Sequence, residues 1–280
     1  MNKKSNVTVI IPCYNDGKYI EEALYSVYNQ TQLPEKIIVV DDGSDMATKK
    51  VLAALNHPLL QIVHQENKGV SAARNNAINL AQTDFIVNLD ADDYYEATFI
   101  EKAITILNSQ PAVGVVSSLC RTFNDKGSIE IVKPIGGTIT DFIVINSGRA
   151  SAMFRKSCWE QAGGYDEQML AGYEDWEFWI AITKKGWSMH IIPEVLSHYR
   201  IKSESRDRTA IREHDFELRQ YIINKHKEIY LVHFDFFSGE LVRQNSLLRT
   251  TIKNMKESKE FRLGETILAP FRYFKKRVFK

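Results

Sequence analysis

Long hydrophobic runs and an excess of either charge are both missing from this 280-residue chain. No apolar run approaches the roughly 18 residues of a membrane-spanning helix, and the run at 7–11 is too short for the core of a signal peptide. We therefore expect a cytoplasmic protein. The 36 basic and 35 acidic residues nearly balance, so no global field favours nucleic acid, and we expect no such partner.

Cysteine is also scarce. Cys13, Cys120 and Cys158 are scattered and lack Cys-x-x-Cys spacing, which argues against a disulfide framework and against a structural zinc site. We expect plain thiols that behave as small buried hydrophobes. The chain is long enough for one large α/β domain, alone or with an appendage.

Short β-branched runs alternate with amphipathic segments over the first ninety residues. The runs predict buried strands at 7–11, 36–40, 60–63 and 85–89. Apolar residues at helical spacing predict helices at 19–30, 49–55 and 71–81. This alternation predicts an α/β fold with a Rossmann-like, mostly parallel central sheet flanked by helices.

The pattern loosens after residue 94. The later helices and strands are predicted at 98–108, 113–118, 129–132, 174–185 and 189–192, with a hairpin turn at 124–127. Beyond about residue 207, charged and apolar residues interleave at helical spacing. This last pattern predicts a C-terminal helical appendage.

Three of the predicted strands end in polar clusters. The clusters are Pro12-Cys13-Tyr14-Asn15, Asp41-Asp42-Gly43-Ser44 and Asp90-Ala91-Asp92-Asp93. In open α/β sheets, ligands bind beyond the carboxyl ends of the strands, so the clusters predict one site at one edge of the sheet.

The third cluster has the spacing of a metal site. Asp90 and Asp92 face the same way along an extended backbone, and Ala91 between them leaves room for a ligand. Their hard oxygen donors suit Mg²⁺ or Mn²⁺ bound to phosphates. The alternative is a solvated acidic turn in which Asp93 caps the next helix.

The second cluster and the helix entry at 67–75 suit a nucleotide. Asp41 and Asp42 precede a tight turn and could accept hydrogen bonds from a base and from ribose hydroxyls, or Asp42 could cap a helix. Arg74 lies about one turn into the next helix, where a guanidinium and a helix N-terminus suit phosphate. A surface ion pair is the alternative for Arg74.

Six motifs in order along residues 6–200 resemble the family 2 glycosyltransferases. They are Val-Ile-Ile-Pro-Cys-Tyr-Asn at 9–15, Val-Asp-Asp-Gly-Ser at 40–44, Asn-Lys-Gly-Val-Ser-Ala-Ala-Arg-Asn at 67–75, Leu-Asp-Ala-Asp-Asp at 89–93, Gly-Gly-Tyr-Asp-Glu at 163–167 and Glu-Asp-Trp-Glu at 174–177. The resemblance implies a GT-A fold, a nucleoside diphosphate sugar donor, a divalent cofactor (Mn²⁺ or Mg²⁺) and inversion at the anomeric carbon.

The resemblance also implies roles for individual residues. The nucleotide-sugar contacts would be Pro12, Tyr14, Asp41, Asp42, Arg74, Asp90 and Ala91. Asp92 would ligate the metal, and His198 would complete its shell, although a structural histidine is an equal alternative. Asp42 would accept from the base, which fits the N3–H of uracil, while guanine and thymine also offer donors.

Asp175 would be the catalytic base. Attack on the anomeric carbon requires the acceptor hydroxyl to lose its proton as the diphosphate leaves from the opposite face. The alternative is a carboxylate at a helix N-terminus that is stabilised by the helix dipole.

The resemblance gives the chain its expected organisation. A glycosyltransferase domain would span 1–206, with a nucleotide-binding part at about 6–94 and an acceptor part at about 95–206. The helical region 207–280 ends in a basic, aromatic tail at 269–280 that suits an anionic membrane surface, or forms a docked helix with a solvated basic face. The enzyme would then lie at the inner face of the plasma membrane.

The acceptor would be a glycan or a lipid-linked sugar in the synthesis of cell-surface polysaccharide. A nucleotide-sugar-binding module without turnover is the alternative, and the intact Asp90, Asp92 and Asp175 disfavour it.

Overall fold

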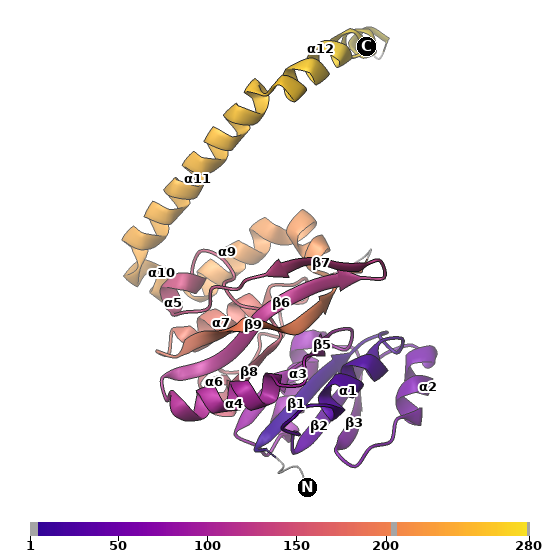
Figure 1. The fold of residues 1–280 in the computed structure, drawn as a ribbon. Coiled ribbons are helices and arrows are strands. Elements are labelled where there is room, and N and C mark those ends of the chain that lie inside the picture. The colour runs from indigo at the N-terminus through magenta and orange to yellow at the C-terminus, as the bar shows by residue number, and fades with distance from the viewer. Residues whose placement is uncertain (1–4, 203–205, 279–280) are drawn as a thin grey trace. The chain divides into compact units, whose positions relative to one another are not determined.

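The computed structural model describes residues 5–202 and 206–278, with side chains at 5–202 and 208–269 (Figure 1). The chain divides into two compact units, Met1–Leu231 and Val232–Lys280. The division of function at residue 206 stays a prediction.

One sheet organises the first unit, in the order β3-β2-β1-β4-β8-β6-β9-β5, with β7 paired to β6. Its strands are β1 (Val7–Cys13), β2 (Lys36–Asp42), β3 (Leu60–Gln65), β4 (Phe85–Asn88), β5 (Tyr94–Tyr95), β6 (Val113–Asn124), β7 (Gly127–Val132), β8 (Ala152–Arg155) and β9 (Ser188–Arg200). Strands β1 to β4 pair in parallel, as do β6 and β9, while β8 runs antiparallel to β4 and β6. The predicted α/β class and mostly parallel sheet are confirmed.

Helices follow the strands along the chain. In the first unit they are α1 (Ile20–Tyr28), α2 (Met46–Ala54), α3 (Val70–Leu80), α4 (Phe99–Ser109), α5 (Ile139–Phe142), α6 (Lys156–Ala162), α7 (Glu174–Thr183), α8 (Arg206–Thr209), the π-helix η1 (Ala210–His214) and α9 (Asp215–Lys225). Helix α10 (Lys227–Val232) reaches the boundary between the units. The helices predicted in the first unit are confirmed to within a few residues.

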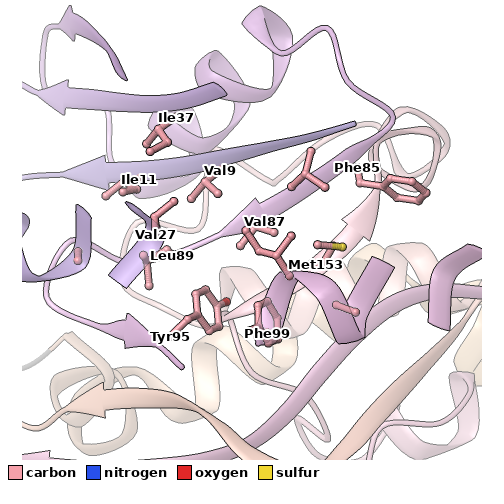
Figure 2. Packing of buried hydrophobic residues seen from close by; sticks show 14 of the residues in the cluster. Val9, Ile11, Val27, Ile37, Phe85, Val87, Leu89, Tyr95, Phe99 and Met153 are labelled. Atoms are coloured by element: carbon pink, nitrogen blue, oxygen red, sulfur yellow. The ribbon is translucent and has the colours of Figure 1, made fainter. Parts of the chain in front are cut away.

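Both faces of the sheet are buried, which explains why its central strands are apolar at successive positions. Val9 belongs to a cluster that includes Phe99 of α4 (Figure 2). Ile10, the next residue, belongs to a second cluster with Ala77 of α3 and Trp179 of α7. Alternation along β1 therefore places α4 and α3 against opposite faces of the sheet.

Several features of the sheet were not predicted, among them the short strand β5, the length of β6, the strand β8 and the length of β9. The four-residue strand β8 carries no pattern long enough to identify it, and β9 runs on to Arg200 instead of ending near residue 192. The extension of β9 matters for the site, because residues 197–200 pair with the last part of β6, and Ser197 and His198 also pair with β5, which directly follows the Asp90–Asp93 cluster.

The second unit contains α11 (Phe234–Glu257) and α12 (Lys259–Val278). Within the described part of the chain, no helix combines the length and the apolar character needed to cross a membrane. The predicted membrane contact of the tail falls mostly on side chains after residue 269, which lie outside the described side chains.

Candidate functional site

A cavity of about 780 Å³ lies at the carboxyl ends of the central strands. Of the residues predicted for the site, those that line it are Pro12, Tyr14, Asp42, Asp90, Ala91, Asp92 and Asp175. The structure thus brings together three strand ends and the start of α7, which are far apart in the sequence. Asp41, Arg74 and His198 lie outside the lining.

Asp42 is held in place by its own surroundings. Its Oδ1 accepts hydrogen bonds from the Lys68 backbone N–H at 2.8 Å and from the Gln65 side chain at 2.8 Å, and its Oδ2 accepts one from the Gly69 N–H at 2.9 Å. Gly69 has a φ of +88°, a conformation that favours glycine at the entry to α3. The loop before α3 therefore fixes the Asp42 carboxylate at the cavity wall.

Asp41 supports the turn behind Asp42 and does not face the cavity. Its Oδ1 accepts from the Ser44 backbone N–H at 2.9 Å, and its Oδ2 lies 2.9 Å from the His64 Nδ1. Burial acts to raise the pKa of the Asp41 carboxyl, but the contacts with Ser44 and His64 outweigh burial and hold that pKa below its ordinary value. The geometry gives Asp41 a supporting place in the turn, and nucleotide contact by Asp41 is without structural support.

Arg74 is fully buried behind the cavity. Its guanidinium donates to Asn88 Oδ1 at 3.1 Å, Glu174 Oε1 at 2.9 Å and Asp90 Oδ1 at 2.8 Å. Burial acts to lower the pKa of Arg74, but Asp90 and Glu174 outweigh it and raise the pKa above its ordinary value. Arg74 therefore joins the end of β4 to the start of α7, and its expected contact with the nucleotide sugar stays a prediction.

Asp92 has a cationic partner from the residues after β9. The Lys202 Nζ lies 2.8 Å from Asp92 Oδ2 and 2.5 Å from Asp16 Oδ1. Burial acts to lower the pKa of Lys202, but its contacts with the two carboxylates outweigh burial and raise the pKa. The sequence interpretation did not identify Lys202, because no local pattern connects it with Asp92.

Asp93 is buried between the end of β4 and the end of β9. Its Oδ1 accepts from the Arg200 backbone N–H at 2.9 Å. Burial raises the pKa of this carboxyl well above its ordinary value, and the nearby Asp92 and Asp90 raise it further. The alternative in which Asp93 caps the next helix is wrong, because α4 begins at Phe99 and its N-cap is Thr98.

Asp175 reaches the cavity from the first turn of α7. Its Oδ2 accepts a hydrogen bond from the Asn146 Nδ2 at 3.0 Å. Tyr173, just before the helix, has a φ of +60°, a strained conformation that is common at functional sites. The Tyr173 hydroxyl donates to Asp215 Oδ1 at 2.5 Å, and burial and Asp215 raise the pKa of Tyr173 to about 12. Helix α9 thus helps to hold the turn that presents Asp175.

Arg149 is a second cation that the sequence interpretation missed. It lines the cavity, with its guanidinium 4.5 Å above the ring of Tyr199, and forms no ion pair within the described part of the chain. A planar guanidinium suits bidentate contact with phosphate.

His198 faces away from Asp92. Its Nε2 lies 2.7 Å from Glu96 Oε1, and its ring stacks on Tyr94 at a centroid distance of 4.2 Å. The next residue, Tyr199, lines the cavity, so the alternation of β9 directs His198 to the other side. Burial lowers the pKa of this imidazole, and Glu96 opposes that effect. The geometry gives the predicted metal role of His198 no support.

The donor set does not fit a resident divalent metal at Asp92. The carboxylate is paired with Lys202, and His198 is directed elsewhere. Among residues 5–202 and the described residues after 205, no three His, Cys, Asp or Glu side chains come together as a metal-binding group. The cationic groups that line the cavity beside these carboxylates include Lys202 and Arg149.

The model of the family described as glycosyl transferase family 2 matches residues 8–161. The chondroitin synthase of Escherichia coli is 27% identical over 192 residues, which cover 66% of this chain and 27% of that protein. TuaG of Bacillus subtilis, named as a teichuronic acid biosynthesis glycosyltransferase, is 27% identical over 210 residues, covering 73% of this chain and 82% of TuaG. The chain spans about a quarter of the length of the chondroitin and hyaluronan synthases that it matches.

Solved structures show the same fold. Staphylococcus aureus TarS 1–349 in complex with UDP-GlcNAc has a TM-score of 0.60 at 21% identity, covering 74% of this chain and 61% of that one. The mannosyltransferase PcManGT from Pyrobaculum calidifontis, solved with GDP-Man and Mn²⁺, has a TM-score of 0.60 at 22% identity, covering 95% of this chain and 85% of that one. The GT-A fold predicted from the motifs is therefore confirmed.

Proposed function

Because this chain belongs to glycosyltransferase family 2, we propose that it is an inverting enzyme that moves a sugar from a nucleoside diphosphate sugar to a glycan or lipid-linked acceptor. The observation that carries this proposal is the shared cavity, which is lined by Asp42, Asp90, Asp92 and Asp175. One wall offers contacts for a nucleotide, and the start of α7 offers a carboxylate for acid–base chemistry.

Asp175 acts as the general base in this proposal. Its carboxylate takes the proton of the acceptor hydroxyl as that oxygen attacks the anomeric carbon and the diphosphate leaves from the opposite face. One such displacement inverts the anomeric centre, and a single base is sufficient. The hydrogen bond from Asn146 and the turn at Tyr173 support this role, because they orient the carboxylate at the cavity wall.

The donor in this proposal is a UDP-sugar. Asp42 lines the cavity, and among the described residues its Oδ2 accepts a hydrogen bond from the Gly69 N–H, so this oxygen has lone-pair capacity for a base N–H. The N3–H of uracil fits this acceptor, and guanine is the competing base. Pro12 and Tyr14 from the end of β1 lie on the same wall.

The pathway in this proposal is cell-surface polysaccharide synthesis. The names of the relatives, which include chondroitin synthase and a teichuronic acid glycosyltransferase, support it. A polymer acceptor carried by a lipid would suit an enzyme at the inner face of the membrane, and contact through the tail at 269–280 stays a prediction. The expected Mn²⁺ or Mg²⁺ cofactor also stays a prediction, and the pairing of Asp92 with Lys202 argues against it.

A thermal-shift screen with UDP-GlcNAc, UDP-glucose and GDP-mannose, each with Mn²⁺ and with EDTA, would identify the donor. We expect one donor to stabilise the protein and to be consumed when oligosaccharide acceptors are added, with release of free nucleoside diphosphate. Stabilisation without consumption for every acceptor would favour the non-catalytic binding module. No response to any donor would contradict the proposed function.

Asp175→Asn tests the base directly. We expect sugar transfer to fall by about 100-fold to 10,000-fold, the usual contribution of a general base, while donor binding is kept. Asp125→Asn, in the exposed hairpin turn between β6 and β7, is the matched control. Full transfer activity in Asp175→Asn would remove Asp175 from the mechanism.

A further inference from the structure

The carboxylate expected to bind a metal already has a cation from its own chain beside it. Lys202 bridges Asp16, in the loop after β1, and Asp92, at the end of β4, with Nζ–oxygen distances of 2.5 and 2.8 Å. Two contacts from separate elements hold the ammonium group at the cavity wall, where Lys202 is among the lining residues. An ammonium carries three N–H donors, one more than these two carboxylates take up.

The groups nearest in sequence to Asp92, and His198, each have one polar atom engaged with another residue, although Asp93 Oδ2 and His198 Nδ1 are buried without a hydrogen-bond partner. Asp90 Oδ1 pairs with Arg74, Asp93 Oδ1 accepts from the Arg200 backbone, and His198 contacts Glu96 on the other side of β9. A divalent ion at Asp92 would therefore have to displace Lys202 and would gain few further protein ligands, whereas Mg²⁺ and Mn²⁺ favour several oxygen donors.

A second positive charge lines the same cavity. Arg149 is more than half buried, and its guanidinium stacks on Tyr199 at 4.5 Å. Asp93, the neighbour of Asp92, is among the groups whose charge acts on Arg149. Lys202 and Arg149 therefore present N–H donors to the same cavity, and donors held in place can stabilise the charge that develops on the oxygens of a leaving diphosphate.

We propose that Lys202, together with Arg149, binds the diphosphate of the donor and neutralises it as it leaves, so that this chain works without a divalent metal. The inference rests on the proposed function, since it names how the donor site of that transferase is built. No bond is made or broken by Lys202. Its ammonium stays protonated and contributes charge and hydrogen bonds to the phosphate oxygens.

Calorimetric titration of the full chain with UDP and with GDP, in EDTA and in Mn²⁺, tests this proposal. For the nucleotide that binds, we expect affinities in the two buffers to agree within about twofold, a difference well under 1.4 kcal/mol. Lys202→Met should weaken binding by about 10-fold to 100-fold, the usual effect of losing a hydrogen bond to a charged group. Lys202→Arg should retain most of the affinity.

Lys18→Met is the matched control, because Lys18 is an exposed lysine of the loop before α1 and does not line the cavity. The nucleotide affinity of the Lys18→Met variant should equal that of the unmodified protein. Thermal unfolding of each variant separates lost binding from lost folding. Lys202→His should make nucleotide binding depend on Mn²⁺, since imidazole beside Asp92 is a metal ligand.

Three outcomes would overturn the inference. The first is a gain in nucleotide affinity of about tenfold or more on adding Mn²⁺ to the unmodified protein. The second is unchanged affinity in a folded Lys202→Met variant. The third is that the unmodified protein binds no nucleotide in either buffer. This outcome would also contradict the proposed function, whereas the first two outcomes would contradict only the inference.

Discussion

The ends of β2 and β4 look alike in the sequence and differ in how they are held. In both places an apolar strand leads into two aspartates that are adjacent or two residues apart, Asp41 and Asp42 at β2 and Asp90 and Asp92 after β4. At β2, Asp42 takes two backbone N–H groups from the loop before α3 and one side-chain donor. At β4, Asp90 and Asp92 are paired with the cationic side chains of Arg74 and Lys202.

The carboxylate at the end of β2 is therefore held mainly by backbone hydrogen bonds, whereas those after β4 are held by ion pairs, which we call the electrostatic anchor. Backbone donors at the end of β2 have fixed positions and carry no full charge, so they fix geometry at low cost. The pairs at β4 depend on charged side chains that are partly or fully buried, and each pair is sensitive to the loss of one partner. The base-recognition wall should therefore tolerate change in charged neighbours, and the diphosphate wall should not.

Arg74→Met should have the largest effect on stability, because Arg74 holds the ion pairs at the end of β4. Removing this guanidinium takes away an ion pair from Glu174, which is nearly fully buried, and another from Asp90. Loss of one partner from a buried ion pair costs about 3 to 5 kcal/mol in the free energy of unfolding. Urea unfolding of the variant and of the unmodified protein measures this difference in the free energy of unfolding.

Arg121→Met is the control for that measurement. Among the described residues, the Arg121 side chain donates one hydrogen bond, to Ser128 at 3.3 Å in an exposed setting, so its removal should change the unfolding free energy by less than about 0.5 kcal/mol. A loss below about 1 kcal/mol in Arg74→Met would show that the network at β4 is not an electrostatic anchor.

A smaller effect is expected at the end of β2 from Asp42→Asn. The introduced amide N–H₂ group would face at least one of the present donors, which costs about 1 to 3 kcal/mol in the free energy of unfolding. Nucleotide binding should fall as well, because the acceptor for the base is lost. Titration with the nucleotide that binds the unmodified protein measures the loss of affinity. Asp41→Asn is the control, because the Asp41 side chain lies outside the cavity lining, and this variant should retain full affinity. Equal losses in the two variants would contradict the separate places given to Asp41 and Asp42.

Local patterns were sufficient to predict the parallel strands β1 to β4 and the edge where the site lies. Residues 7–11 and 36–40 are apolar at successive positions because both faces of the sheet are covered, and the polar clusters follow because those strands end at the same edge. The positions of Asp42, Asp92 and Asp175 in one cavity followed from motifs that lie directly after such strands or at a helix start.

Long-range charge pairing could not be predicted in the same way. Arg74 is 100 residues from Glu174, and Lys202 is far along the chain from Asp92, so no spacing rule connects them. His198 was placed after a strand that was expected to end near residue 192. In the structure β9 continues to Arg200, and its alternation decides which side chains face the cavity.

The smallest expected effect concerns pH and the turn that supports Asp42. The pKa of Asp41 in the folded chain lies below its ordinary value of about 3.9, because hydrogen bonds from Ser44 and His64 outweigh burial. A lowered folded pKa means that the stabilisation is fully present above the unfolded value and is lost as the pH falls through the folded value. Asp41→Asn should therefore cost about 1 kcal/mol at pH 7, and the difference from the unmodified protein should shrink on acidification below about pH 4. Urea unfolding at both pH values measures this, with Asp125→Asn as an exposed control, and a difference that grows in acid would reverse the sign assigned to Asp41.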